Sequence, residues 1–242
     1  MSFLVDLHAH TRMGSSDSRI EAADVFGVNR ATRGIDGIAL TEHLNQWPQD
    51  EFETLTATTF AVNARECDTP YGHILVFGVP DEALVRITAV EDLRTAVLRR
   101  NGLMILAHPF RHYPSSWNLL FRNSRDHWGP RELAEWPPER LGQHPVFGLV
   151  DAVETLNGGC TTAQNTVAGI VARVLGLPEV GASDAHDLSH VGWFATAFDD
   201  AISTEKELLA EIRAGRCTPV ERMRDGSYVR PNGATMADRR RP

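Results

Sequence analysis

The chain has 242 residues, of which 42% are hydrophobic and 23% charged, so it can bury a full-sized core. We expect one domain rather than two, because single α/β barrels often occupy about 200 to 250 residues. The formal net charge of −8 argues against stable binding of nucleic-acid backbones, since such binding depends on clustered Lys and Arg.

Short apolar segments alternate with helical patterns along the whole chain, which is typical of βαβ units around a largely parallel sheet. Seven segments are predicted strands: residues 3–7, 37–40, 59–64, 73–79, 103–107, 151–156 and 180–182. Three segments have apolar residues at helical spacing, each with a glycine shortly after its end: 20–33, 90–100 and 161–175. A closed or nearly closed α/β barrel fits this order best.

Two segments depart from the alternation. Residues 111–148 are rich in Pro, Trp and Arg and have little periodicity, so we expect a long loop or cap within a domain of residues 1–221. Residues 222–242 are polar and end in three arginines, which predicts a poorly ordered tail. The tryptophans of the first segment could stack on a substrate or belong to the core.

The three cysteines are odd in number and include no C-x-x-C pair: Cys67, Cys160 and Cys217. This pattern indicates neither a disulfide framework nor a thiolate zinc site. The chain starts without a basic segment followed by a long apolar one, and no run of about 18 apolar residues occurs. We therefore expect a cytoplasmic protein with no membrane partner.

Six of the ten histidines stand at the ends of predicted strands: His8, His10, His43, His73, His108 and His186. Three carboxylates accompany them, Asp17, Glu66 and Asp184. In α/β barrels the strand ends meet at one face, so these side chains are predicted to converge there. Imidazole and carboxylate together suit Zn, Mn or Fe, and nine candidates fit two or three ions that share a bridging carboxylate.

Each motif alone also fits a structural role. An H-x-H pair in a strand merely places two side chains on one face, and Asp184 could be a helix cap. The joint pattern is harder to explain as core packing, because buried ionisable groups are costly unless they are paired or bound to metal.

As a set, the motifs H-x-H, Ser-Asp, T-E-H, R-E-C with G-H-I-L, A-H-P and S-D-A-H resemble the polymerase and histidinol phosphatase (PHP) superfamily, particularly its stand-alone phosphoesterases. The resemblance spans residues 6 to about 215 and implies a distorted (β/α)7 barrel with up to three metal ions. It assigns the first ion to His8, His10, Glu66 and Asp184, the second to Glu66, His73 and His108, and the third to Asp17, His43 and His186. Two departures are Glu42, where the family usually has Asp, and a longer loop around Asp17.

The resulting hypothesis is a metal-dependent phosphoesterase that hydrolyses a small phosphorylated substrate, a phosphomonoester rather than a phosphodiester. A hydroxide shared by two divalent ions would attack phosphorus. Arg111 is the candidate catalytic and phosphate-binding residue and His112 a second substrate-binding candidate, with Arg122 and Arg125 weaker ones. A surface arginine at the start of a loop is the alternative interpretation of Arg111.

Glu154 lies within the sixth predicted strand and Asn157 follows it. These two residues could orient ligand imidazoles or serve packing and turn roles. The sequence leaves these two interpretations open.

Two other functions stay open. An amidohydrolase also begins its barrel with H-x-H, and its binuclear members use a carboxylated lysine; the only lysine here, Lys206, lies beyond the last motif. That position excludes a lysine bridge but not a Glu-bridged or single-metal amidohydrolase. A non-catalytic PHP module is the third possibility, although such modules would be expected to lose ligands. The substrate could be a nucleotide, a sugar phosphate or histidinol phosphate.

Overall fold

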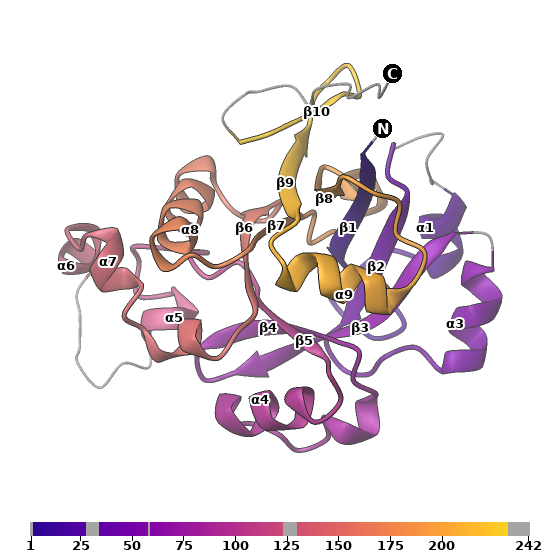
Figure 1. The fold of residues 1–242 in the computed structure, drawn as a ribbon, viewed down its shortest axis with the longest axis horizontal. Helices are drawn as coiled ribbons and strands as arrows, with labels where there is room; N and C mark the ends of the chain where they lie inside the picture. The colour runs from indigo at the N-terminus through magenta and orange to yellow at the C-terminus, as the bar shows by residue number, and fades with distance from the viewer. Residues whose placement is uncertain (1, 28–33, 58, 123–129, 232–242) are drawn as a thin grey trace.

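The computed structural model describes residues 2–27, 34–57, 59–122 and 130–231. Within these ranges, ten strands form one sheet that curls into a half-barrel (Figure 1). The strands are β1 Phe3–Ala9, β2 Gly37–Glu42, β3 Phe60–Thr69, β4 Gly72–Phe77, β5 Leu103–Leu106, β6 Ala152–Asn157, β7 Glu179–Ala182, β8 Phe194–Phe198, β9 Cys217–Arg222 and β10 Tyr228–Val229.

Helices lie around the sheet, with α1 and α3 at one end of the molecule and α5 to α8 at the other (Figure 1). The α-helices are α1 Ala22–Gly27, α3 Gln49–Thr56, α4 Val90–Leu98, α5 Leu119–Arg122, α6 Pro130–Ala134, α7 Pro138–Leu141, α8 Thr162–Leu175 and α9 Glu205–Arg213. Short 3-10 helices are η1 Asp81–Ala83, η2 Pro145–Gly148 and η3 Leu188–His190. In the described part of the chain, no helix is both long and apolar enough to cross a membrane.

The sheet has the order β10-β9-β8-β1-β2-β3-β4-β5-β6-β7. Although β7 is last in this order, the segment that follows it returns to β1. Ala185 forms an isolated parallel bridge with Ala9, and the Asp184 N–H donates to the His8 carbonyl at 2.7 Å. These contacts bring the segment after β7 beside the end of β1, which carries His8 and leads into His10.

The expectation of a largely parallel sheet was wrong for about half of the strand pairs. Four pairs are parallel, β1–β2, β2–β3, β5–β6 and β6–β7, and the other five are antiparallel. For the β3–β4 pair the reason is the connection: only Pro70 and Tyr71 separate the two strands, and so short a connection can only join antiparallel strands. A strict (β/α)7 barrel is therefore not confirmed, whereas an α/β fold with a curled sheet is.

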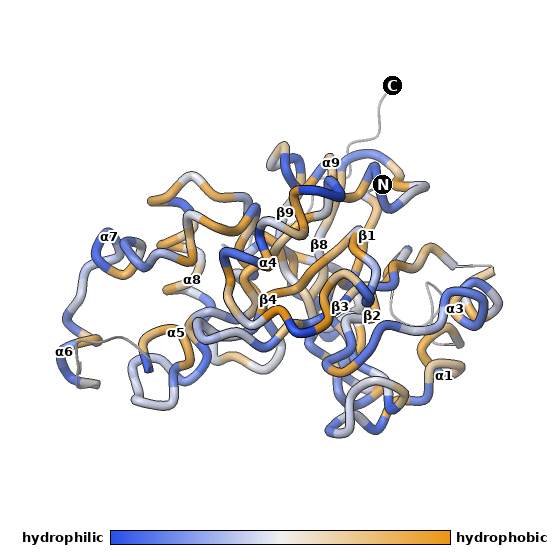
Figure 2. Tube along the Cα trace, turned by 90° about the horizontal axis from the view of Figure 1, so that it is seen from below, coloured by the Kyte–Doolittle hydropathy of each residue, from blue (hydrophilic) through white to orange (hydrophobic). Residues whose placement is uncertain are grey.

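Both faces of the central strands are buried, which explains their continuous apolar character. Side chains alternate along β4: Ile74 and Val76 pack in the core cluster that includes α4 and α8, while Leu75 and Phe77 pack in the cluster that includes α9. Figure 2 shows hydrophobic stretches on β1 and β4 in the middle of the molecule and hydrophilic stretches on outer helices such as α7. The sheet thus forms a rigid frame for the side chains at its strand ends.

All seven predicted strands are present as β1 to β7, and the helices predicted at 90–100 and 161–175 are α4 and α8. The predicted helix at 20–33 appears as α1, with residues 28–33 outside the described ranges. The expected loop or cap at 111–148 contains α5, α6, α7 and η2, and residues 123–129 lie outside the described ranges. Part of the expected tail forms β10, which pairs with β9. Its last residues, 232–242, are not among those described.

Candidate metal centre

The strand ends meet at one mouth of the curled sheet. His8, His10, His43, His108 and the Asp184–His186 segment follow or end strands that run in the same direction. Glu66 lies near the end of β3, and His73 begins β4, which is antiparallel to β3 and so starts at the same mouth. Sequence-distant residues are thereby brought to one place.

The Glu66 carboxylate lies at the centre of this cluster and is 1% exposed. Imidazole nitrogens of five histidines lie within hydrogen-bonding or near-contact distance of its two oxygens: His73 at 2.8 Å, His108 at 3.0 Å, His8 and His10 at 3.2 Å, and His43 at 3.3 Å. Burial alone would raise the pKa of Glu66, but His8 and the other imidazoles outweigh it and hold that pKa well below its usual range. A buried carboxylate surrounded by so many imidazole nitrogens offers a donor set for divalent cations.

Asp184 approaches the same ring nitrogens of His8 and His10 that Glu66 contacts. Its Oδ1 is 3.4 Å from Nε2 of both His8 and His10, and those two nitrogens are 3.0 Å apart. Burial would lower the pKa of His8, yet Asp184 and Glu66 together raise it well above its usual value. The pair of carboxylates therefore creates a strongly negative, buried position that favours a cation.

A third group of ligands lies at the more open side of the cluster. Asp17 Oδ2 is 3.2 Å from His186 Nε2 and 3.7 Å from His43 Nε2. The His10 ring stacks against the rings of both histidines, with centroids 4.5 Å and 4.4 Å away. The Asp17 side chain is 59% exposed, so this group is the one most accessible to solvent.

All nine residues singled out from the sequence as metal ligands are thus brought together. Four triads have donor atoms within 4.8 Å of one another: His10–His43–His186, His8–His108–Glu154, His8–His10–Glu66 and Glu66–His73–His108. Every donor is an imidazole nitrogen or a carboxylate oxygen, a set that suits Zn, Mn or Fe.

A hydrogen-bond relay fixes the orientation of His10. The Ser15 hydroxyl has one hydrogen, which it donates to the Glu42 carboxylate at 2.7 Å. Ser15 Oγ must then accept from Nδ1–H of His10 at 3.0 Å, which leaves Nε2 of His10 unprotonated toward Glu66. Ligand imidazoles commonly donate their second nitrogen in this way. Glu42 is itself held by donors from Thr11 and Trp47.

Other histidines are oriented by different acceptors. His8 Nδ1 lies 3.1 Å from Glu154 Oε1, and Glu154 also accepts from the His108 backbone N–H at 2.8 Å. Asn157 donates to the same carboxylate at 2.9 Å, so the orienting role left open for Glu154 and Asn157 is the one their contacts fit. His186 Nδ1 faces the Asp184 carbonyl at 2.9 Å.

Two orienting residues were missed from the sequence. Asp68 Oδ1 lies 3.1 Å from His73 Nε2, and this contact lowers the pKa of Asp68. The spacing of Glu66 and Asp68 along one strand, which places both on one face, was the signal that could have identified it. Ser15 had no such signal, because its role depends on how the loop after β1 folds back.

The backbone is also unusual in this region. His108 has a φ of 29° and Asp184 a φ of 52°, both in the left-handed range that non-glycine residues rarely adopt. Such conformations persist where surrounding contacts enforce them, and they concentrate at functional sites.

Arg111 reaches from the turn after β5 to the cluster. Its Nη2 donates to Asp184 Oδ2 and to Asn157 Oδ1, the latter at 2.8 Å. Burial works against its charge, but Asp184 outweighs this and raises the pKa of Arg111. Gly159 leaves room for the guanidinium, since a Cβ at that position would lie 2.2 Å from Nη2.

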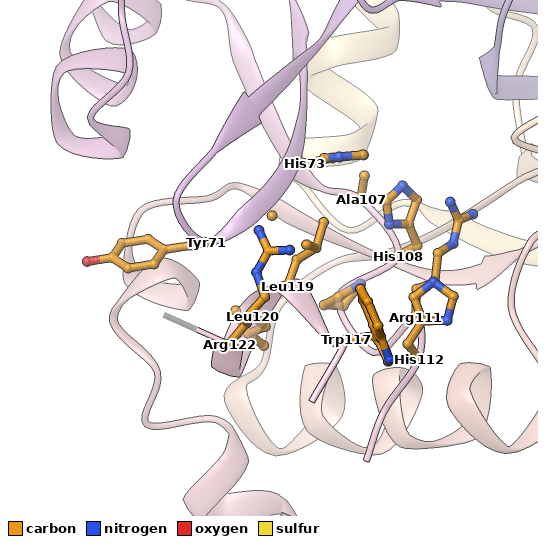
Figure 3. A pocket seen from close by; sticks show the side chains of 12 residues that line it. Tyr71, His73, Ala107, His108, Arg111, His112, Trp117, Leu119, Leu120 and Arg122 are labelled. Carbon is orange, nitrogen blue, oxygen red and sulfur yellow. The ribbon is translucent and has the colours of Figure 1, made fainter. Parts of the chain in front are cut away.

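A pocket with a volume of about 450 Å³ opens beside the cluster (Figure 3). His73 and His108 line it together with Arg111, His112 and Arg122. The two residues predicted to bind substrate, Arg111 and His112, therefore lie in its wall. Of the two weaker candidates, Arg122 lies in the wall and Arg125 falls outside the described ranges.

Comparison with known proteins gave one family model, described as PHP-associated, which matches residues 162–217. A search of the curated proteins found no match. Solved structures share the fold, including a two-domain Bacteroides vulgatus protein described as containing a predicted PHP-like metal-dependent phosphoesterase. That likeness has a TM-score of 0.61 and 17% identity and covers 90% of this chain and 64% of the other.

Two further solved structures have the same fold. The lesion-specific endonuclease of Pyrococcus furiosus has a TM-score of 0.57 and 15% identity, over 88% of this chain and 56% of that one. A Chromobacterium violaceum amidohydrolase with bound sulfate and no metal has a TM-score of 0.56 and 15% identity, over 94% of this chain and 98% of that one. The chain thus spans less than two thirds of the Bacteroides and Pyrococcus proteins. Residues 162–217 thus match a PHP-associated model and the chain shares its fold with these structures, and both findings agree with the resemblance that the motifs indicated.

Proposed function

We propose that this protein is a metal-dependent phosphoesterase and that it hydrolyses phosphomonoesters in preference to phosphodiesters. The observation that carries the proposal is the buried Glu66 carboxylate, which is shared by imidazoles from five histidines at separate strand ends. A cluster of ionisable groups this dense is costly to bury without cations to neutralise it.

The donor set fits two to three divalent ions, of Zn, Mn or Fe. We assign His8, His10, Glu66 and Asp184 to the first ion, Glu66, His73 and His108 to the second, and Asp17, His43 and His186 to the third. The distances among these donors and the orienting contacts of Ser15, Glu154 and Asp68 support this assignment, because they aim ring nitrogens at a common centre.

Bound divalent ions would lower the pKa of a coordinated water toward neutrality and polarise a phosphoryl oxygen. Side chains of the protein itself would bind the substrate. Arg111 lines the pocket beside His108, where its guanidinium can bind phosphoryl oxygens, and Asn157 and Asp184 hold it in place. His112 lies in the same wall and is the second proposed contact with substrate.

The rival functions have specific support too. The Chromobacterium structure carries the name amidohydrolase, but the ligand in it is sulfate, a tetrahedral oxyanion like phosphate. The Pyrococcus relative is an endonuclease, and so cleaves phosphodiesters in DNA. The net charge of −8 disfavours that substrate here. A non-catalytic module would not need the oriented Arg111.

The test is an activity panel on protein stripped of metal and reloaded with Zn, Mn or Fe. We expect hydrolysis of p-nitrophenyl phosphate, slower hydrolysis of bis-p-nitrophenyl phosphate, and none of an amide and lactone panel. Arg111→Ala should keep its metal content but lose turnover by orders of magnitude, whereas Arg131→Ala, on an exposed helix, should match the parent. Amide or lactone hydrolysis without phosphatase activity would favour the amidohydrolase. Metal binding with no hydrolysis at all would favour a non-catalytic module.

A further inference from the structure

The pocket beside the cluster has a polar end at two histidines, and its remaining wall combines apolar and aromatic side chains with basic ones. His73 and His108 form the end that meets the proposed metal centre. Much of the remaining wall is apolar or aromatic, from Tyr71, Ala107, Pro109, Trp117, Leu119 and Leu120. Figure 3 shows Leu119 and Trp117 between His108 and the more distant Tyr71 and Arg122. A substrate whose phosphate lies at the histidines would therefore place its organic part against apolar side chains.

The charged side chains among the described lining residues are all basic. Arg111 and Arg122 are cationic, and none of the described residues that line the pocket is acidic. A positively charged group on the substrate would meet these like charges, and no carboxylate among the described lining residues could pair with it. An amine-bearing leaving group is thus disfavoured, and an uncharged one is tolerated.

The size of the pocket admits a ring. An aromatic ring needs a cavity of about 150 Å³, and the pocket offers about 450 Å³. Trp117 lies in this wall with 72% of its surface exposed, the highest value among the large hydrophobic side chains in the described ranges. A planar apolar group bound against it would cover that surface.

We propose that this pocket binds the leaving group of the substrate, and that the substrate is a phosphate monoester of an alcohol that bears an apolar ring and no positive charge. This inference rests on the proposed phosphoesterase function. It adds the chemistry of the alcohol, which the metal ligands by themselves do not specify.

Three esters with the same kind of reacting bond test it: propyl phosphate, 3-phenylpropyl phosphate and 3-aminopropyl phosphate. All are primary alkyl phosphates, so differences in rate report on the pocket rather than on the leaving oxygen. Burying a phenyl group predicts a kcat/KM for the phenyl ester about tenfold to a hundredfold above that of propyl phosphate. The amino ester should fall below propyl phosphate.

Trp117→Ala should bring the ratio of phenylpropyl to propyl kcat/KM toward one. The matched control is Trp193→Ala, because Trp193 is also partly exposed but packs on His190 and is not among the residues that line the pocket. It should keep the parent ratio. Equal kcat/KM for the three esters, a preference for the amino ester, or an unchanged ratio in Trp117→Ala would overturn the inference.

A binding experiment separates this failure from failure of the proposed function. In calorimetry on metal-loaded protein, 3-phenylpropylphosphonate should bind about tenfold or more tightly than propylphosphonate. If this preference holds but none of the three esters is hydrolysed, the phosphoesterase proposal fails while the ligand preference of the pocket stands. If the esters are hydrolysed without preference and the phosphonates bind equally, only the inference about the pocket fails.

Discussion

Replacing Ser15 with Ala tests whether the relay from Glu42 prepares His10 for metal binding. Ser15 is 1% exposed, and its hydroxyl takes part in three hydrogen bonds: it donates to Glu42 at 2.7 Å and accepts from the His10 ring at 3.0 Å and from the His43 backbone N–H at 3.2 Å. The variant removes the acceptor that fixes the tautomer of His10, while Glu42 keeps its donors from Thr11 and Trp47. Losses of this kind typically cost about 10- to 100-fold in metal affinity, or roughly 1.4 to 2.7 kcal/mol.

The assay is titration of metal-free protein with Zn against a chromogenic chelator, with urea unfolding of the metal-free forms alongside. Ser18→Ala is the matched control, because the Ser18 hydroxyl is also buried in this loop and donates to the His10 carbonyl at 2.8 Å without contacting the ring. Both variants should lose about 1 to 3 kcal/mol of unfolding free energy. Only Ser15→Ala should lose metal affinity. Equal metal affinities for the two variants would refute the relay.

Three further perturbations have defined outcomes. Gly159→Ala should push the Arg111 guanidinium aside, since the new Cβ would lie 2.2 Å from Nη2, and so reduce turnover with metal content kept; unchanged kcat would contradict this. Asp68→Asn removes the charged acceptor 3.1 Å from His73, and chelator competition should show metal affinity lowered by up to about tenfold. Burial lowers the pKa of His144 from 6.5 to about 4, so as the pH falls its imidazole is protonated in the unfolded chain before it is protonated in the folded protein. The free energy of unfolding therefore decreases as the pH falls from 6.5 to about 4. His144→Asn should flatten the pH dependence of urea midpoints between pH 6.5 and about 4, and an unchanged slope would exclude His144 as its source.

The sequence predicted the strands that carry the site because their apolar runs are bounded by turn residues and buried on both faces. It did not predict β8 to β10. Pro219 interrupts the apolar pattern of β9, and β10 has only two residues. The apolar pattern also did not predict strand direction. The apolar run of β4 is compatible with a parallel or an antiparallel strand, and only its two-residue connection to β3 makes the pair antiparallel.

The candidate ligands could be predicted because strand ends converge in any curled α/β sheet. Their orientation could not, since it depends on contacts between segments far apart in sequence. Ser15 contacts Glu42, which is 27 residues away in the sequence, and Glu154 contacts His8, which is 146 residues away. Arg111 lies at the mouth of the sheet, but nothing in its sequence context indicated that Asp184 would be its partner.

The most direct test of the account is the metal content of the purified protein measured together with its activity. Protein dialysed against chelator and reloaded should bind two to three equivalents of divalent metal per chain, and phosphatase activity should rise as those sites fill. Glu66→Gln, which removes the shared charge at the centre of the cluster, should retain at most one equivalent and no activity. Fewer than two equivalents in the parent protein, or full binding in Glu66→Gln, would contradict the proposal that these residues form one multinuclear centre.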